Sequence, residues 1–118
     1  MDNRAIGVFD SGIGGLTVVK ELMKILPNEK IVYFGDTARV PYGSRSEETI
    51  KKFSKECISF LDKKDIKSLI IACNTVSAVA IEMLKEEFDM HILGVIIPGS
   101  KMASEVTNNN RIGVIGTN

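Results

Sequence analysis

The sequence predicts an α/β fold, an open parallel sheet with helices on both faces. Segments with the pattern of strands alternate along the chain with segments that have the periodicity of helices. The apolar run 68–73 is nearly uninterrupted, as expected of a strand covered on both faces in a parallel sheet. With 118 residues, 44% of them hydrophobic and 25% charged, the chain has room for one packed domain. We therefore expect right-handed crossovers within a single domain, 1–118.

The first half of the chain is expected to form two strands and two helices. Their order is a strand at 5–9, a helix at 16–26, a strand at 30–35, a long polar loop at 36–46 and a helix through 50–61. Glycines 12, 14 and 15 separate the first strand from the first helix, which Pro27 ends. Ser44 and Glu47 resemble a capping box before the second helix.

The second half continues the alternation. It is expected to contain a strand at 68–73, a helix at 76–88, a strand at 92–96, a short helix from Pro98 to about 106 and a fifth strand at 112–115. Ligands of such sheets bind beyond the carboxyl ends of the strands. The residues expected at that edge are Asp10, Ser11, Asp36, Thr37, Cys73, Asn74, Thr75, the segment around Pro98, and Thr117.

Charge and composition exclude several function classes. Fifteen basic residues balance fifteen acidic ones, so no positive field is expected to recruit nucleic acid or an anionic membrane. No apolar run approaches the roughly 20 residues of a membrane-spanning helix, and the start of the chain lacks the pattern of a secretory signal. Two cysteines make no disulfide framework, and no spacing resembles a metal site. We expect a cytoplasmic protein with reduced thiols and no metal.

Cys73 is the first candidate for chemistry. It is expected at a strand end, just before a helix whose dipole and amides favour a thiolate that could act as base or nucleophile. Asn74 and Thr75 could donate hydrogen bonds to a ligand. The alternatives are that Cys73 is a small buried hydrophobic residue and that its neighbours only cap the helix. Cys57 lies in an apolar helical stripe, which favours a core position.

The segment 10–15, Asp-Ser-Gly-Ile-Gly-Gly, is the second candidate. A glycine cluster after the first strand, with Asp36 after the second, suggests dinucleotide binding. However, Thr17 stands where that fingerprint has its third glycine, and Asp10 would repel a pyrophosphate and attract an ammonium group. The loop therefore favours an amino acid as ligand. The alternative is that the glycines only permit a tight turn and that Asp10 caps the first helix.

The loop after the second strand is a weaker candidate. Its Val-Pro-Tyr-Gly segment, 40–43, has the composition of an ordered binding loop. Arg39 and Arg45 flank it and could hold a carboxylate, although a solvated position is the preferred interpretation. His91, the one histidine, is expected to be exposed and structural, and no Ser-His-Asp triad is indicated.

Four motifs together carry a resemblance to a known family. They are Asp-Ser-Gly-Ile-Gly-Gly at 10–15, Gly-Asp-Thr-Ala-Arg-Val-Pro-Tyr-Gly at 35–43, Ala-Cys-Asn-Thr at 72–75 and Ile-Gly-Val-Ile-Gly-Thr at 112–117. In this order they resemble the N-terminal half of bacterial glutamate racemases, in the cofactor-independent aspartate/glutamate racemase superfamily. The resemblance implies interconversion of L- and D-glutamate for peptidoglycan by two cysteines on opposite sides of the substrate, without a cofactor or metal.

The resemblance also assigns roles to residues. Cys73 matches the first cysteine, and Asp10 would assist it and meet the substrate ammonium group. The implied substrate-binding residues are Ser11, Pro41, Tyr42, Gly43, Asn74, Thr75 and Thr117. Together they would share the work of removing a weakly acidic α proton.

The chain departs from the family pattern in one respect. The family's second cysteine lies in a Gly-Cys-Thr-His motif that does not occur in these 118 residues, and Cys57, in a helix, cannot replace it. The chain is therefore expected to be one lobe of a two-lobe racemase. A homodimer is also expected. A racemase of the same superfamily acting on aspartate or another amino acid, and a non-catalytic binding module, remain as alternatives.

Overall fold

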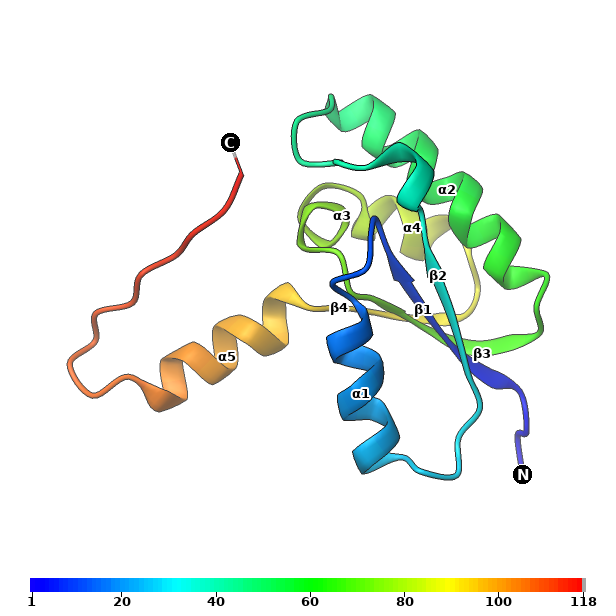
Figure 1. The fold of residues 1–118 in the computed structure, drawn as a ribbon, viewed down its shortest axis with the longest axis horizontal. Coiled ribbons are helices and arrows are strands. Elements are labelled where there is room, and N and C mark those ends of the chain that lie inside the picture. Colours follow the sequence, from blue (N-terminus) through cyan, green and yellow to red (C-terminus); the bar gives the residue numbers. More distant parts are fainter. Residues whose placement is uncertain (118) are drawn as a thin grey trace.

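The computed structural model describes residues 1–117 and contains a four-stranded parallel sheet flanked by helices (Figure 1). The strands lie in the order β2-β1-β3-β4. Their bounds are Ala5–Asp10 for β1, Ile31–Gly35 for β2, Ile66–Ile71 for β3 and His91–Gly94 for β4. The open parallel sheet predicted from the alternating pattern is thus confirmed.

The register of β1 with its two neighbours places the candidate site. Phe9 pairs with Phe34 of β2 on one side and with Ile71 of β3 on the other. Beyond these pairs, Asp36 donates its backbone N–H to the carbonyl of Asp10 at 3.0 Å. The carboxyl ends of the three strands therefore meet at one edge of the sheet, where ligands of such folds bind.

Helices cover both faces of the sheet, as predicted. The bounds are Leu16–Ile25 for α1, Glu47–Asp62 for α2, Asn74–Val79 for α3, Ile81–Glu87 for α4 and Ile96–Val106 for α5, with a short 3-10 turn at Thr37–Arg39. Figure 1 shows α1 on one side of the sheet and α2, α3 and α4 on the other. This is the arrangement that right-handed crossovers produce when β2 and β3 lie on opposite sides of β1.

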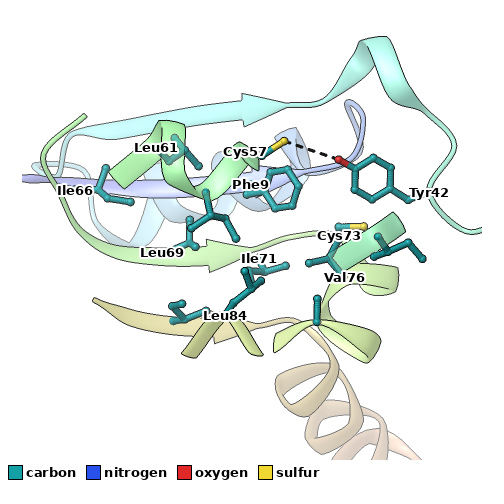
Figure 2. Close-up of a cluster of buried hydrophobic side chains, with 14 of the residues drawn as sticks. Phe9, Tyr42, Cys57, Leu61, Ile66, Leu69, Ile71, Cys73, Val76 and Leu84 are labelled. Carbon is teal, nitrogen blue, oxygen red and sulfur yellow. Dashed lines mark hydrogen bonds between the residues drawn. The ribbon is translucent and has the colours of Figure 1, made fainter. Parts of the chain in front are cut away.

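The main core lies between the sheet and the helices α2, α3 and α4 (Figure 2). Most of its fully buried side chains come from β1, β3 and these helices, and Tyr42 comes from the loop after β2. Those of the strands and helices include Phe9, Leu69, Ile71, Ile58, Leu61, Val76 and Leu84. Val8, which alternates with Phe9 along β1, is also fully buried. Both faces of the central strand are therefore covered, which explains the unbroken apolar runs in the sequence.

Helix boundaries differ from the prediction in three places. The single helix expected at 76–88 is two helices, because the backbone of Ala80 leaves the helical region at φ −122° and ψ −10°. Helix α5 begins at Ile96 and includes Pro98 in its first turn, where a missing N–H costs no helical hydrogen bond. Ser46, not Ser44, caps α2: its side chain accepts a 3.2 Å hydrogen bond from the backbone N–H of Thr49.

The fifth strand predicted at 112–115 is wrong within the described residues, because this segment pairs with no strand there. Helix α5 leads the chain away from β4, and the following residues run back from the far end of α5 in an extended path toward the loop before α2 (Figure 1). Ile112, Val114 and Ile115 are exposed on this path. A strand-like pattern needs an adjacent edge to pair with, and the course of α5 places β4 out of reach.

Among residues 1–117, no helix has the length and apolar character needed to cross a bilayer.

Candidate functional site

A pocket of about 920 Å³ opens at the carboxyl ends of β1 and β3. It gathers six of the nine residues that the sequence nominated: Asp10, Ser11, Cys73, Asn74, Thr75 and Thr117. Parallel strands end at a common edge, so residues 60 positions apart in the sequence come together there. The remaining three, Pro41, Tyr42 and Gly43, do not line this pocket.

Asp10 ends β1 with a carboxylate held by two backbone amides. One oxygen accepts a hydrogen bond from the N–H of Ser11 at 2.8 Å, and the other accepts one from the N–H of Gly15 at 2.7 Å. Gly15 immediately precedes α1, so Asp10 does bind an amide at the start of that helix while also lining the pocket. The contact with the Gly15 amide agrees with the capping interpretation of Asp10, and the same residue lines the pocket.

Tyr33 supports the loop that carries these amides. Its hydroxyl donates a 2.7 Å hydrogen bond to the carbonyl of Gly12. Burial raises the pKa of the Tyr33 phenol, and the nearby negative charge of Asp10 raises it further. The phenol therefore stays protonated and continues to donate to the loop at neutral pH.

Cys73 occupies the turn between β3 and α3. Its backbone is extended, at φ −84° and ψ 121°, and its side chain is 5% exposed. The thiol donates to the hydroxyl of Ser11 at 3.4 Å, which brings the second motif against the first. A cysteine that is almost buried yet borders a cavity can meet a ligand while being shielded from bulk water.

Gly43 lines a neighbouring pocket of about 290 Å³ rather than the larger one. Thr75 and Thr117 border both pockets, so the two cavities are adjacent. A Cβ atom built on Gly43 would lie 2.6 Å from Cγ2 of Thr117. Only glycine fits this contact, which joins the loop after β2 to the C-terminal segment.

The side chain of Tyr42 lies elsewhere than the predicted ligand-binding position. It is 1% exposed and packs in the core beside Phe9 (Figure 2). Its ring centroid is 6.4 Å from that of Phe9 and 5.8 Å from that of Phe53. Its hydroxyl donates to the carboxylate of Asp36. Burial and this carboxylate raise the pKa of Tyr42 far above its usual range. Within this geometry, only the backbone of Tyr42 remains for contact with a ligand. Pro41 is exposed and borders neither pocket.

Arg39 is not the solvated arginine that the sequence favoured. It donates from Nε to Asp36 at 2.7 Å and from Nη1 to Glu56 at 2.6 Å. Its guanidinium also lies 4.0 Å from the centre of the Phe53 ring. Both carboxylates raise the pKa of Arg39, Glu56 most strongly. Arg45 is exposed, as the sequence favoured, and donates to the carbonyl of Arg39 at 3.0 Å.

Cys57 and His91 lie where the sequence predicted. Cys57 is 2% exposed in the core cluster, and burial raises the pKa of its thiol. His91 begins β4 and is exposed.

Several lining residues of the larger pocket were not nominated from the sequence. They are Val95, Ile96, Thr17, Val18 and Ala78; Gly14, Gly15, Ala72, Val114, Ile115 and Gly116 also line the pocket and lie within the sequence motifs, although none of them was assigned a role of its own. Val95 and Ile96 directly follow the carboxyl end of β4, so the rule that nominated Asp10 and Cys73 also points to them once the end of β4 is known. Residues 114–116 belong to the motif at 112–117, but only their folding path shows that they line the pocket.

The geometry gives little support to a nucleotide or metal at this edge. The amides of Ser11 and Gly15, which a pyrophosphate would need, are bound to the Asp10 carboxylate. Asp36, the candidate ribose ligand, is buried and engaged by Arg39 and Tyr42. Within 1–117, no group of three or more His, Cys, Asp or Glu side chains is arranged to hold a metal ion.

Comparison with known proteins identifies the family of this chain. Residues 6–118 match the family described as Asp/Glu/Hydantoin racemase. The chain belongs to this family.

Curated relatives at high identity are named glutamate racemase. The protein from Geobacter metallireducens is 56% identical over 114 residues, which are 97% of this chain and 42% of the relative. That from Lactococcus lactis subsp. lactis is 54% identical, covering 99% of this chain and 43% of the relative. The chain thus spans less than half the length of these relatives.

Solved structures of similar proteins share the fold. A glutamate racemase from Aquifex pyrophilus superposes with a TM-score of 0.93 at 52% identity, covering 96% of this chain and 45% of that one. The glutamate racemase from Francisella tularensis in complex with D-glutamate has a TM-score of 0.87 at 53% identity, covering 99% of this chain and 44% of that one.

Proposed function

We propose that this chain supplies the first catalytic cysteine and part of the substrate pocket of a glutamate racemase that works without a cofactor. The observation that carries the proposal is the position of Cys73, which borders the same pocket as the carboxylate of Asp10 and has its thiol 3.4 Å from the Ser11 hydroxyl. Family membership and the names of the relatives support the substrate.

The proposed reaction begins with proton removal by the Cys73 thiolate. The bond between Cα and its hydrogen breaks, the proton passes to sulfur, and the electron pair moves into the substrate carboxylate to give an enolate-like anion. A proton delivered to the opposite face of Cα then yields the other enantiomer. In the reverse direction Cys73, as the thiol, returns the proton.

The charge pattern of the pocket fits an amino-acid substrate. Asp10 is the one charged side chain among its described lining residues and would attract the substrate ammonium group. The carboxylates would be held by hydroxyls and amides from Ser11, Asn74, Thr75 and Thr117, with the backbone N–H groups of Tyr42 and Gly43 at the rim. Neutral donors aimed at developing charge stabilise an enolate-like anion without neutralising the base.

The second cysteine of the proposed mechanism would come from the part of the relatives' length that this chain does not span. The chain would then be one lobe of a two-lobe enzyme, with the pocket facing the second lobe. We further propose that the whole enzyme is a cytoplasmic homodimer that supplies D-glutamate for peptidoglycan.

A related racemase that acts on aspartate is the second candidate. The family description names aspartate as well as glutamate, and the pocket residues would serve either substrate. Assays with both amino acids distinguish the two, because a preference for aspartate would contradict the substrate assigned here.

Proton exchange in deuterated water tests the proposed role of Cys73. The chain is incubated with D-glutamate or with L-glutamate, and loss of the α-proton signal is followed by NMR. We expect exchange of one enantiomer without inversion, because one base is present. Cys73→Ala should abolish the exchange, whereas Cys57→Ala, which removes a core thiol, should retain it.

A chimaera extends the same test to racemisation. Residues 1–118 replace the matching part of the Geobacter metallireducens relative, and circular dichroism follows conversion of each enantiomer. We expect activity in the chimaera with Cys57→Ala and a loss of about 10²–10⁴-fold or more with Cys73→Ala. Racemisation that survives Cys73→Ala would contradict the proposal. Tight dinucleotide binding without glutamate binding, measured by calorimetry, would favour a non-catalytic module instead.

A further inference from the structure

We propose that the side chains of Asp36 and Tyr42 form a positioning pair that holds the backbone of Tyr42 and Gly43 at the rim of the substrate pocket. The inference rests on the proposed function, since it assigns this segment a role in binding glutamate. The pair lies on the core side of the loop, away from the cavity that it would shape. Asp36 and Tyr42 would therefore act through the backbone rather than by touching substrate.

Tyr42 anchors the loop to the core. Its ring packs between Phe9 of β1 and Phe53 of α2, and its hydroxyl donates to Asp36. Figure 2 shows the ring beside Phe9, with the hydroxyl directed toward Cys57. A fully buried aromatic ring has few alternative positions, because core packing is dense. The backbone on either side of Tyr42, which includes Gly43, is thereby fixed relative to β1 and α2.

Asp36 ties the same loop to the strand that carries Asp10. Its backbone N–H donates to the carbonyl of Asp10 at 3.0 Å, while its carboxylate accepts from Tyr42 and, at 2.7 Å, from Arg39. The carboxylate is nearly buried, so losing one donor leaves a charged group under-satisfied. Asp36 thus couples the end of β1 to the loop through two different parts of one residue.

The loop meets the pocket through Gly43. The space at its Cα is so restricted that an added Cβ would overlap Thr117, which lines both pockets. The carbonyl of Tyr42 also accepts from the N–H of Arg45 at 3.0 Å, which closes a turn around Gly43. A shift of Tyr42 would therefore change the contact between Gly43 and Thr117.

The loop needs such anchors because regular structure contributes little to its order. Between β2 and α2, only the 3-10 turn Thr37–Arg39 is helical. Ordering a backbone costs conformational entropy for each residue, and side-chain contacts must offset it. Asp36 and Tyr42 supply these contacts at the two ends of the segment 37–41.

Affinity for D-glutamate separates positioning from simple stabilisation. Isothermal calorimetry compares the chain with its Tyr42→Phe and Asp36→Asn variants, and Cys57→Ala serves as the matched control. Cys57 lies in the same buried cluster, 3.9 Å from the Tyr42 hydroxyl, but its removal leaves the Asp36–Tyr42 hydrogen bond in place. We expect about tenfold weaker binding for Tyr42→Phe, a smaller loss for Asp36→Asn, which keeps an acceptor oxygen, and unchanged affinity for Cys57→Ala.

Kinetics in the chimaera described above give a second readout. A displaced binding segment should raise KM several-fold more than it lowers kcat, because Cys73 itself is not moved. Equal affinity and equal KM in wild type and Tyr42→Phe, at matched folded fractions, would overturn the inference. A loss of affinity in Cys57→Ala as large as that in Tyr42→Phe would also overturn it. Such a result would mean that Asp36 and Tyr42 affect binding only through the stability of the core.

Amide NMR without ligand separates failure of this inference from failure of the proposed function. Tyr42→Phe should shift the amide signals of Gly43 and Thr117, whereas Cys57→Ala should leave both in place. If the wild-type chain and the chimaera bind neither enantiomer of glutamate, the proposed function fails, and the amide signals alone decide whether the pair sets the loop position. Unshifted Gly43 and Thr117 signals in Tyr42→Phe would then overturn the positioning role.

Discussion

The two cysteines of this chain have nearly the same exposure and very different surroundings. Cys73 is 5% exposed and Cys57 is 2% exposed, and both belong to the core cluster. Yet Cys73 borders a pocket of about 920 Å³ at the edge of the sheet, beside a hydroxyl and near a carboxylate. Cys57 lies on the inner face of α2, where Tyr42 and Arg39 contact its sulfur.

The comparison shows that burial alone does not distinguish the core cysteine, Cys57, from the cysteine that lines the pocket, Cys73. What differs is whether the sulfur borders a cavity that a ligand could enter. At Cys57, burial and the nearby negative charge of Asp36 raise the pKa of the thiol, which keeps it protonated and inert. The pocket at Cys73 instead brings the thiol to polar partners at the ends of two strands.

Alkylation rates give the sharpest test of this difference. In the folded chain we expect iodoacetamide to modify Cys73 about 100-fold faster than Cys57, because Cys57 reacts only when α2 opens from the core. Peptide mass mapping over time measures both rates in one sample. In urea the two rates should converge. Equal rates in the folded chain would contradict this prediction and show that α2 opens often enough to expose Cys57 to the reagent.

A methyl group at Gly15 should disturb the residues around the larger pocket and leave the core around Cys57 intact. A Cβ there would lie 2.8 Å from Cβ of Asp10 and 3.0 Å from Cβ of Ala72, so Gly15→Ala requires a backbone shift. We expect a loss of about 2 kcal/mol in the free energy of unfolding, from urea denaturation, together with a displaced Ser11 amide signal.

Gly14→Ala is the matched control for this overpacking. Its Cβ would meet only an oxygen of Asp10 at 3.8 Å, an ordinary contact. Its stability should stay within about 0.5 kcal/mol of wild type. A similar loss in both variants would mean that the glycines are needed for the turn itself rather than for the close approach at Gly15.

Local pattern predicts the pocket well where strand ends supply its residues. Asp10 and Cys73 could be nominated because each follows an apolar run and precedes a helix, and parallel strands end together. The side-chain position of Tyr42 could not be predicted in this way. It depends on Phe9, Asp36 and Phe53, which are set by long-range packing rather than by the residues next to Tyr42.

The errors in the fold have the same origin. Segment 112–115 has the composition of a strand, but strand formation needs an edge, and α5 directs this segment away from β4. Ser44 and Ser46 both stand three residues before a residue that could complete a cap, and the choice of Ser46 depends on where the loop turns. The periodicity of the sequence identifies helices and strands, whereas their end residues and the strands that they pair with depend on the packing of the whole domain.

Alkaline pH should destabilise the chain through the buried groups around Cys57. The pKa of Cys57 is raised above 9.0 and that of Tyr42 above 10.0, so the folded state retains protons that the unfolded state releases. This stabilisation is complete below about pH 9 and is lost as the pH rises through the raised folded pKa values. We expect the free energy of unfolding to fall by about 1.4 kcal/mol per pH unit for each such group.

Urea denaturation between pH 7 and pH 10.5 measures this slope. Cys57→Ala should remove the component that begins near pH 9 and leave the component that begins near pH 10, which belongs to the tyrosines. Cys73→Ala is the comparison variant. An unchanged profile in Cys57→Ala would show that the alkaline loss arises outside this cluster.

Loss of the α2 cap should have the smallest effect on stability, and this effect should be confined to α2, the helix that carries Cys57. The Ser46 side chain accepts from the N–H of Thr49, so Ser46→Ala leaves that amide without its partner and should cost about 1 kcal/mol. Ser44→Ala, two residues earlier, should cost less, since Ser44 is exposed and is not the capping residue. Hydrogen exchange should quicken in the first turn of α2 and stay unchanged in α3, beside Cys73. If α3 loosened equally, the two cysteine environments would belong to one cooperative unit, and the pocket could not be altered independently of the core that supports it.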